Sequence, residues 1–160
     1  IMLASFFLDA YAFSTEGVVG FTIGRKAKKS FLQAVSNSFR LSFVTGLFIS
    51  IIYLFSFKHI IGALTDLDYL IFLTYGYSFW VILIPPIASF CYQFDGIFIG
   101  ASQTSEIRNS MVISVILFIL FSIYLIDNLG NHGLWLSLLF FMIIRSITLN
   151  FYFSKILRKF

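Results

Sequence analysis

The chain has 160 residues, of which 59% are hydrophobic, 20% are aromatic and only 11% are charged, and its formal net charge is +4. A soluble domain usually carries about 25% charged residues, so this composition excludes an ordinary water-soluble protein and indicates that lipid is the solvent. The cations are divided among several connections and form no compact basic face, which argues against nucleic acid as a partner.

Hydropathy divides the chain into five apolar segments. Each is long enough to cross a hydrocarbon layer of about 30 Å as a helix of about 20 residues. No segment alternates with the period of two that a barrel strand requires. We therefore expect an all-α, polytopic membrane helix bundle with five transmembrane helices, at about residues 1–24, 37–57, 69–100, 109–126 and 133–153.

The first expected helix, residues 1–24, carries two acids inside an apolar sequence. Asp9 and Glu16 are two helical turns apart, so both carboxylates lie on about the same stripe. A carboxylate at membrane depth costs about 2.5 kcal/mol or more, which makes such groups functional candidates. Gly20 and Gly24 form a G-x-x-x-G pair, which predicts close helix packing. One face of this helix is expected to line a cavity or to meet another helix.

The third expected helix, residues 69–100, is longer than a straight crossing of the bilayer requires. Pro85 and Pro86 lie near its middle, where they remove two amide donors, so a hinge in the form of a kink or an unwound turn is predicted there. A proline-broken membrane helix with an acid a few turns later is typical of secondary transporters. A purely structural kink is the alternative interpretation.

Asp95 follows the prolines by two to three turns and is the third acid within an apolar segment. Gly96 and Gly100 come after it and predict a small-residue packing face beside the carboxylate. Asp95 is therefore the first candidate for binding a coupling ion or a substrate, and Glu16 and Asp9 are further candidates.

The last expected helix, residues 133–153, contains Arg145 among apolar residues. Counted along the helices from their basic ends, Arg145 lies at about the depth of Glu16 and Asp95, while Asp9 lies nearer the opposite end. Pairing with one of the two acids at its level is the cheapest way to keep these charges in lipid. Arg145 is therefore predicted to form a structural ion pair, with a direct substrate contact as the alternative.

Lysine and arginine residues gather on one side of the membrane if the chain crosses it five times. The opposite side has Lys58 alone. By the positive-inside rule the basic side is cytoplasmic, which predicts a cytoplasmic C-terminus. The cations of the basic side are Arg25, Lys26, Lys28, Lys29, Arg40, Arg108, Lys155, Arg158 and Lys159.

The sequence has no catalytic or metal-binding signature. It lacks P-loop, G-x-S-x-G and H-E-x-x-H motifs, its two histidines fall in connections, and Cys91 is its single cysteine. An enzyme, a metal site and an organic cofactor are therefore not expected. Cys91 is interpreted as a small packed residue.

Three stretches of the chain resemble a known family. They are LDAYAFSTEGVVGFTIGRK, PPIASFCYQFDGIFIGASQTSEIRNSM and GLWLSLLFFMIIRSITLN, and the block from Asp95 to Met111 is the most specific. They are similar to the C-terminal half of the multidrug and toxin extrusion (MATE) family, most closely its DinF-like branch. The resemblance implies a fold of twelve helices in two lobes, of which this chain would supply helices eight to twelve, without the N-terminal lobe and helix seven.

The resemblance also implies a function. Similar proteins export organic, often cationic compounds across the plasma membrane by antiport with protons or sodium, so the expected partners are the bilayer, the N-terminal lobe, a small cationic substrate and a coupling ion. Asp95 matches the helix-ten acid implicated in cation coupling, and Asp9 and Glu16 match polar positions of helix eight. Five helices with half a pathway are not expected to transport alone. The alternatives are a lipid-linked oligosaccharide flippase of the same superfamily and a non-transporting membrane scaffold or subunit.

Overall fold

The computed structural model describes residues 2–160, and within them the chain is all-helical, which confirms the predicted fold class. The described part contains six helices, so the predicted number of five is wrong. They follow one another as α1 (Met2–Gly24), α2 (Lys28–Leu64), α3 (Asp68–Tyr75), α4 (Ser78–Gly100), α5 (Thr104–Leu129) and α6 (Asn131–Leu157).

The additional helix arises because the third apolar segment breaks at Gly76 and Tyr77. The Gly76 amide bonds back to the carbonyls of Leu73 and Thr74, which ends α3 after eight residues. Helix α4 then continues through Pro85 and Pro86, so the unwinding predicted at the prolines is not observed. Glycine weakens a helix interior by about 1 kcal/mol relative to alanine, and Gly76 was the sequence signal for this break.

Four of the described helices, α2, α4, α5 and α6, are long and apolar enough to span a membrane. Helix α1 has 23 residues but is not among them, because Asp9 and Glu16 reduce the hydropathy of its sequence. The helices also extend beyond the apolar segments: α2 has 37 residues and includes the polar stretch from Lys28 onward. Hydropathy locates the part of a helix that lies in lipid, whereas backbone hydrogen bonding continues into water.

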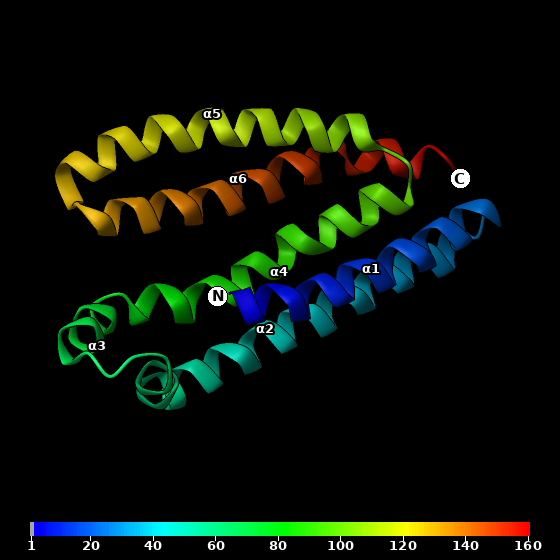
Figure 1. Ribbon diagram of the computed structural model, residues 1–160. Helices are drawn as coiled ribbons and strands as arrows, with labels where there is room; N and C mark the ends of the chain where they lie inside the picture. The colour runs from blue at the N-terminus through cyan, green and yellow to red at the C-terminus, as the bar shows by residue number, and fades with distance from the viewer. Residues whose placement is uncertain (1) are drawn as a thin grey trace.

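Helix α4 is the central helix of the bundle. It packs against α1 and α2 on one side and against α6 on the other, while α5 packs mainly on α6 (Figure 1). In its most apolar stretch 56% of residues are buried, against 17% in α2, α5 and α6. Neighbouring helices therefore cover the side chains of α4 more fully than those of α2, α5 and α6.

The basic connections lie together at one end of the bundle. The α1–α2 turn, the α4–α5 turn and the C-terminus share the right-hand end of Figure 1. The Lys159 ammonium donates to the Ala101 carbonyl at 2.5 Å, and Lys155 pairs with Glu106 at 3.0 Å. These contacts attach the C-terminal end of α6 to the α4–α5 turn.

Candidate functional site

Helices α1 and α4 approach each other through two glycines of α4. A Cβ atom at Gly96 would collide with the backbone of Ala12, and one at Gly100 would collide with the backbone of Glu16. Only glycine permits this separation, so the pair predicted to pack beside Asp95 makes a direct backbone contact with α1. Small residues are the usual means of close helix approach in lipid.

The glycines of α1 contribute less to this contact. A Cβ atom at Gly20 would lie 3.4 Å from the Gly100 carbonyl oxygen, an ordinary contact distance. Among the described residues nothing lies within 4 Å of a Cβ atom placed at Gly24, so no close approach depends on that glycine. The glycines on α4 therefore determine how near the α1 carboxylates come to Asp95.

All three predicted acids and the predicted arginine line a single cavity. Its volume is about 210 Å³, and it lies between α1, α4, α5 and α6. We call it the acidic cavity. Its lining consists of Asp9, Ala12, Phe13, Glu16, Asp95, Gly96, Ile99, Ile107 and Arg145.

One ion pair crosses the acidic cavity. The Arg145 Nη2 atom donates to Asp95 Oδ1 at 2.8 Å, and the two side chains are 14% and 21% exposed. The sequence allowed Arg145 to pair with either Glu16 or Asp95, and in the structure it pairs with Asp95. The Arg145 Nε atom is buried and has no hydrogen-bond partner among the described residues. The guanidinium therefore retains a donor for a further acceptor.

The other two acids have no counter-ion among the described residues. Asp9 and Glu16 are half-buried, and neither forms an ion pair with a residue that the structure describes. When all groups are ionised, the cavity holds three carboxylates against one guanidinium, an excess of two negative charges. Charges shielded from water attract a counter-ion more strongly than the same charges in bulk solvent. The excess negative charge attracts a cation or a proton electrostatically, although no three of the described acids, histidines and cysteines are grouped so that they could hold a metal ion.

A partly buried polar cluster that the sequence did not reveal lies between α1, α2 and α4. The Thr15 hydroxyl lies 2.8 Å from Gln93 Oε1, and the Thr45 hydroxyl donates to the Tyr11 phenol at 3.0 Å. Gln93 is fully buried, and its Nε2 atom has no partner among the described residues. The available signal was a glutamine within an apolar helix, since a buried amide is costly unless it is hydrogen-bonded.

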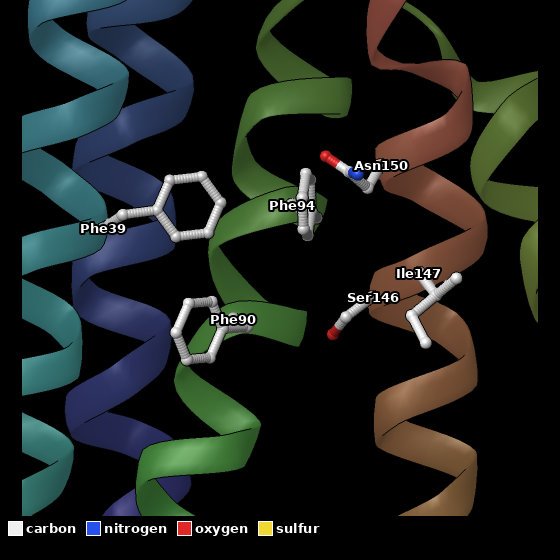
Figure 2. Close-up of a pocket in the computed structure, with 6 residues that line it drawn as sticks. All are labelled: Phe39, Phe90, Phe94, Ser146, Ile147 and Asn150. Atoms are coloured by element: carbon white, nitrogen blue, oxygen red, sulfur yellow. The ribbon is translucent and has the colours of Figure 1, made fainter.

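A second cavity lies on another side of the contact between α4 and α6. Its volume is about 380 Å³, and Figure 2 shows rings from α2 and α4 facing side chains of α6 across it. We call it the apolar groove. Its lining, as far as the structure describes the chain, is uncharged and consists of Phe39, Phe90, Phe94, Ser146, Ile147 and Asn150.

The chain is thus a helical membrane protein whose bundle holds two carboxylates, Asp9 and Glu16, that form no ion pair with a described residue. The model of the MatE family matches residues 1–125, and the chain belongs to that family. It is also 33% identical over 149 residues to DNA damage-inducible protein F of Escherichia coli (strain K12), a match that covers 93% of this chain and 32% of the relative. The chain thus spans about a third of that relative's length. No solved structure matches the chain significantly.

Proposed function

We propose that this chain is the C-terminal part of a secondary active transporter that exports organic cations across the plasma membrane in exchange for protons or sodium. The observation that carries the proposal is the acidic cavity, which is lined by three carboxyl groups and one guanidinium. Membership of the MatE family supports it. The basic end of the bundle favours a cytoplasmic C-terminus.

In this mechanism Asp95 exchanges partners. In the structure Arg145 neutralises the Asp95 carboxylate at 2.8 Å. A coupling proton or sodium ion then competes with the guanidinium for the carboxylate, and a cationic substrate does so in the other state of the cycle. Asp9 and Glu16 share the cavity without an ion pair to a described residue, so they supply the initial attraction for the incoming cation. The exchange requires a rocking motion of two lobes, so residues 1–160 alone are expected to be inactive.

Two alternatives are less well supported. A scaffold would neutralise its membrane-embedded acids, whereas Asp9 and Glu16 line a cavity without an ion pair to any described residue. A flippase for anionic lipid-linked sugars would require free cations. The cation that lines the acidic cavity, Arg145, is already paired with Asp95.

The direct test is Asp95→Asn in the full-length protein, reconstituted in proteoliposomes and energised by a proton or a sodium gradient. Loss of the carboxylate is expected to reduce gradient-driven cation efflux at least about tenfold, because the charge that both ions share is gone. Asp127→Asn is the matched control, since Asp127 is exposed near the end of α5 and does not line the cavity. Unimpaired, still gradient-driven efflux by Asp95→Asn would remove Asp95 from the coupling role.

A second test addresses the scaffold. Cysteines are introduced singly at Asp9, Glu16 and Asp95 in a protein whose buried Cys91 is replaced by serine, and each is treated with a water-soluble maleimide. A water-accessible transport cavity predicts labelling at all three positions. Labelling at none of them would favour the scaffold.

A further inference from the structure

The double proline of α4 leaves two carbonyl groups without their helical donors. Pro86 has no N–H to give to the Ile82 carbonyl, and Pro85 has none for the Val81 carbonyl. Such groups inside a membrane protein must find another donor, because water is scarce and an unpaired polar group is costly. Helix α4 nevertheless runs unbroken from Ser78 to Gly100.

Helix α2 supplies a donor. The Ser50 hydroxyl is 2.6 Å from the Ile82 carbonyl oxygen, the group that Pro86 leaves unbonded. The same hydroxyl lies 3.0 Å from the Gly46 carbonyl of its own helix, and Ser50 is buried, with 7% of its surface exposed. A serine of one helix thus compensates for a proline of another.

Gly46 makes this contact possible. A Cβ atom at Gly46 would lie 2.9 Å from the Pro85 carbonyl oxygen and 3.0 Å from the Pro86 Cα atom, both backbone atoms that cannot turn aside. Gly46 and Ser50 are one helical turn apart and therefore lie on one face of α2. We call these two residues, with the Ile82–Pro86 turn that they hold, the proline cradle.

The cradle contacts α4 at the turn from which the C-terminal half of this helix extends. Asp95 lies nine residues beyond Pro86, about 13 Å along the helix, so a bend of about 10° at the prolines would displace it by about 2 Å. That displacement is comparable to the 2.8 Å length of its ion pair with Arg145. Helix α4 is thus held by α2 at its prolines and by α1 at Gly96, next to Asp95.

From this geometry we infer that Gly46 and Ser50 are positioning residues, which set the place of Asp95 in the acidic cavity through the proline turn. The inference rests on the proposed function for its consequence in transport, but the placement of Asp95 is measurable without transport. Neither residue lines the acidic cavity, so their effect on it is indirect.

The experiment compares Ser50→Ala and Gly46→Ala with two controls on the same helix. Ser56→Ala removes a serine for which no hydrogen bond is found in the described structure, and Gly62→Ala adds a methyl group where nothing lies within 4 Å. Each is made in the full-length protein with Cys91→Ser and a reporter cysteine in place of Asp95. Ser50→Ala preserves the packing shape, so it stays informative if Gly46→Ala fails to fold.

For both cradle variants the maleimide labelling rate at position 95 is expected to change about fivefold. This factor corresponds to the loss of one hydrogen bond worth about 1 kcal/mol. Both controls are expected to leave the labelling rate unchanged. With Asp95 restored, Ser50→Ala is expected to raise the half-saturating concentration of the coupling ion by a similar factor. An unchanged labelling rate in Ser50→Ala would overturn the inference even if Asp95→Asn abolishes transport. A changed rate supports it even if that transport test fails.

Discussion

The acidic cavity and the apolar groove lie on different sides of the same pair of helices, α4 and α6. Charged side chains line the cavity, whereas aromatic, aliphatic and neutral polar side chains line the groove. On α4 the neighbouring residues Phe94 and Asp95 line the groove and the cavity respectively, and on α6 Ser146 and Arg145 do the same. A step of one residue turns the side chain by about 100° around a helix. The rotation of α4 and α6 about their own axes therefore determines which of their residues face the acidic cavity and which face the apolar groove.

The difference also concerns what holds each region together. In the acidic cavity a charge pair and a backbone contact at glycine join the helices. In the groove the contacts are between rings, such as Phe39 and Phe94 at 5.1 Å between centroids. Substitutions in the cavity are expected to affect both stability and transport, whereas substitutions in the groove are expected to affect stability alone.

The largest effect is expected for Arg145→Gln. It leaves Asp95 without its counter-ion in a mostly buried site, which we expect to lower the free energy of unfolding by about 2–4 kcal/mol. Detergent-titrated unfolding of the full-length protein in mixed micelles measures this loss. The double variant Arg145→Gln with Asp95→Asn should recover part of it, because no unpaired charge remains. A double variant less stable than the single one would contradict the ion pair as the cause.

Gly100→Ala should have the next largest effect. Its methyl group would collide with the Glu16 backbone and force α1 away from α4, at a cost of about 1–3 kcal/mol in the same unfolding measurement. Gly24→Ala is the matched control, because its methyl group meets nothing within 4 Å among the described residues. Equal effects of the two substitutions would show that the glycines of α1 and α4 do not differ in packing.

The smallest effect is expected in the apolar groove. Phe94→Leu should cost about 1 kcal/mol through lost ring contacts and leave the half-saturating ion concentration unchanged. Ser146→Ala should cost under about 0.5 kcal/mol, because the Ser146 hydroxyl donates to the Met142 carbonyl of its own helix. A change in ion dependence in Phe94→Leu would remove the functional distinction between the two regions.

Several features were predictable because they depend on residue type and local spacing. Apolar segments of membrane-spanning length predict helices in any tertiary context, and acids within them stand out because a carboxylate is costly in lipid. The similar depth of Arg145 and Asp95 followed from counting helical rise. The end of α3 at Gly76 was also within reach, since a glycine after a short apolar run is a local signal.

Other features required the packed structure. Local rules predict an interruption at Pro85 and Pro86, but a hydroxyl from Ser50, 36 positions before Pro86, bonds the carbonyl that the proline leaves free. The bond between Thr15 and Gln93 likewise joins residues 78 positions apart. No local pattern specifies such partners.

Composition, the length of the apolar segments and the motif that begins at Asp95 were enough to predict a helical membrane protein of the MatE family. The cost of a carboxylate in lipid made Asp9, Glu16 and Asp95 the candidate site residues. Three features required the packed helices: the pairing of Arg145 with Asp95, the close backbone contact at the glycines of α4 rather than at Gly24, and the continuity of α4 at its prolines. Depth in a membrane follows from position along a helix, whereas a partner depends on how each helix is rotated and which neighbour it meets.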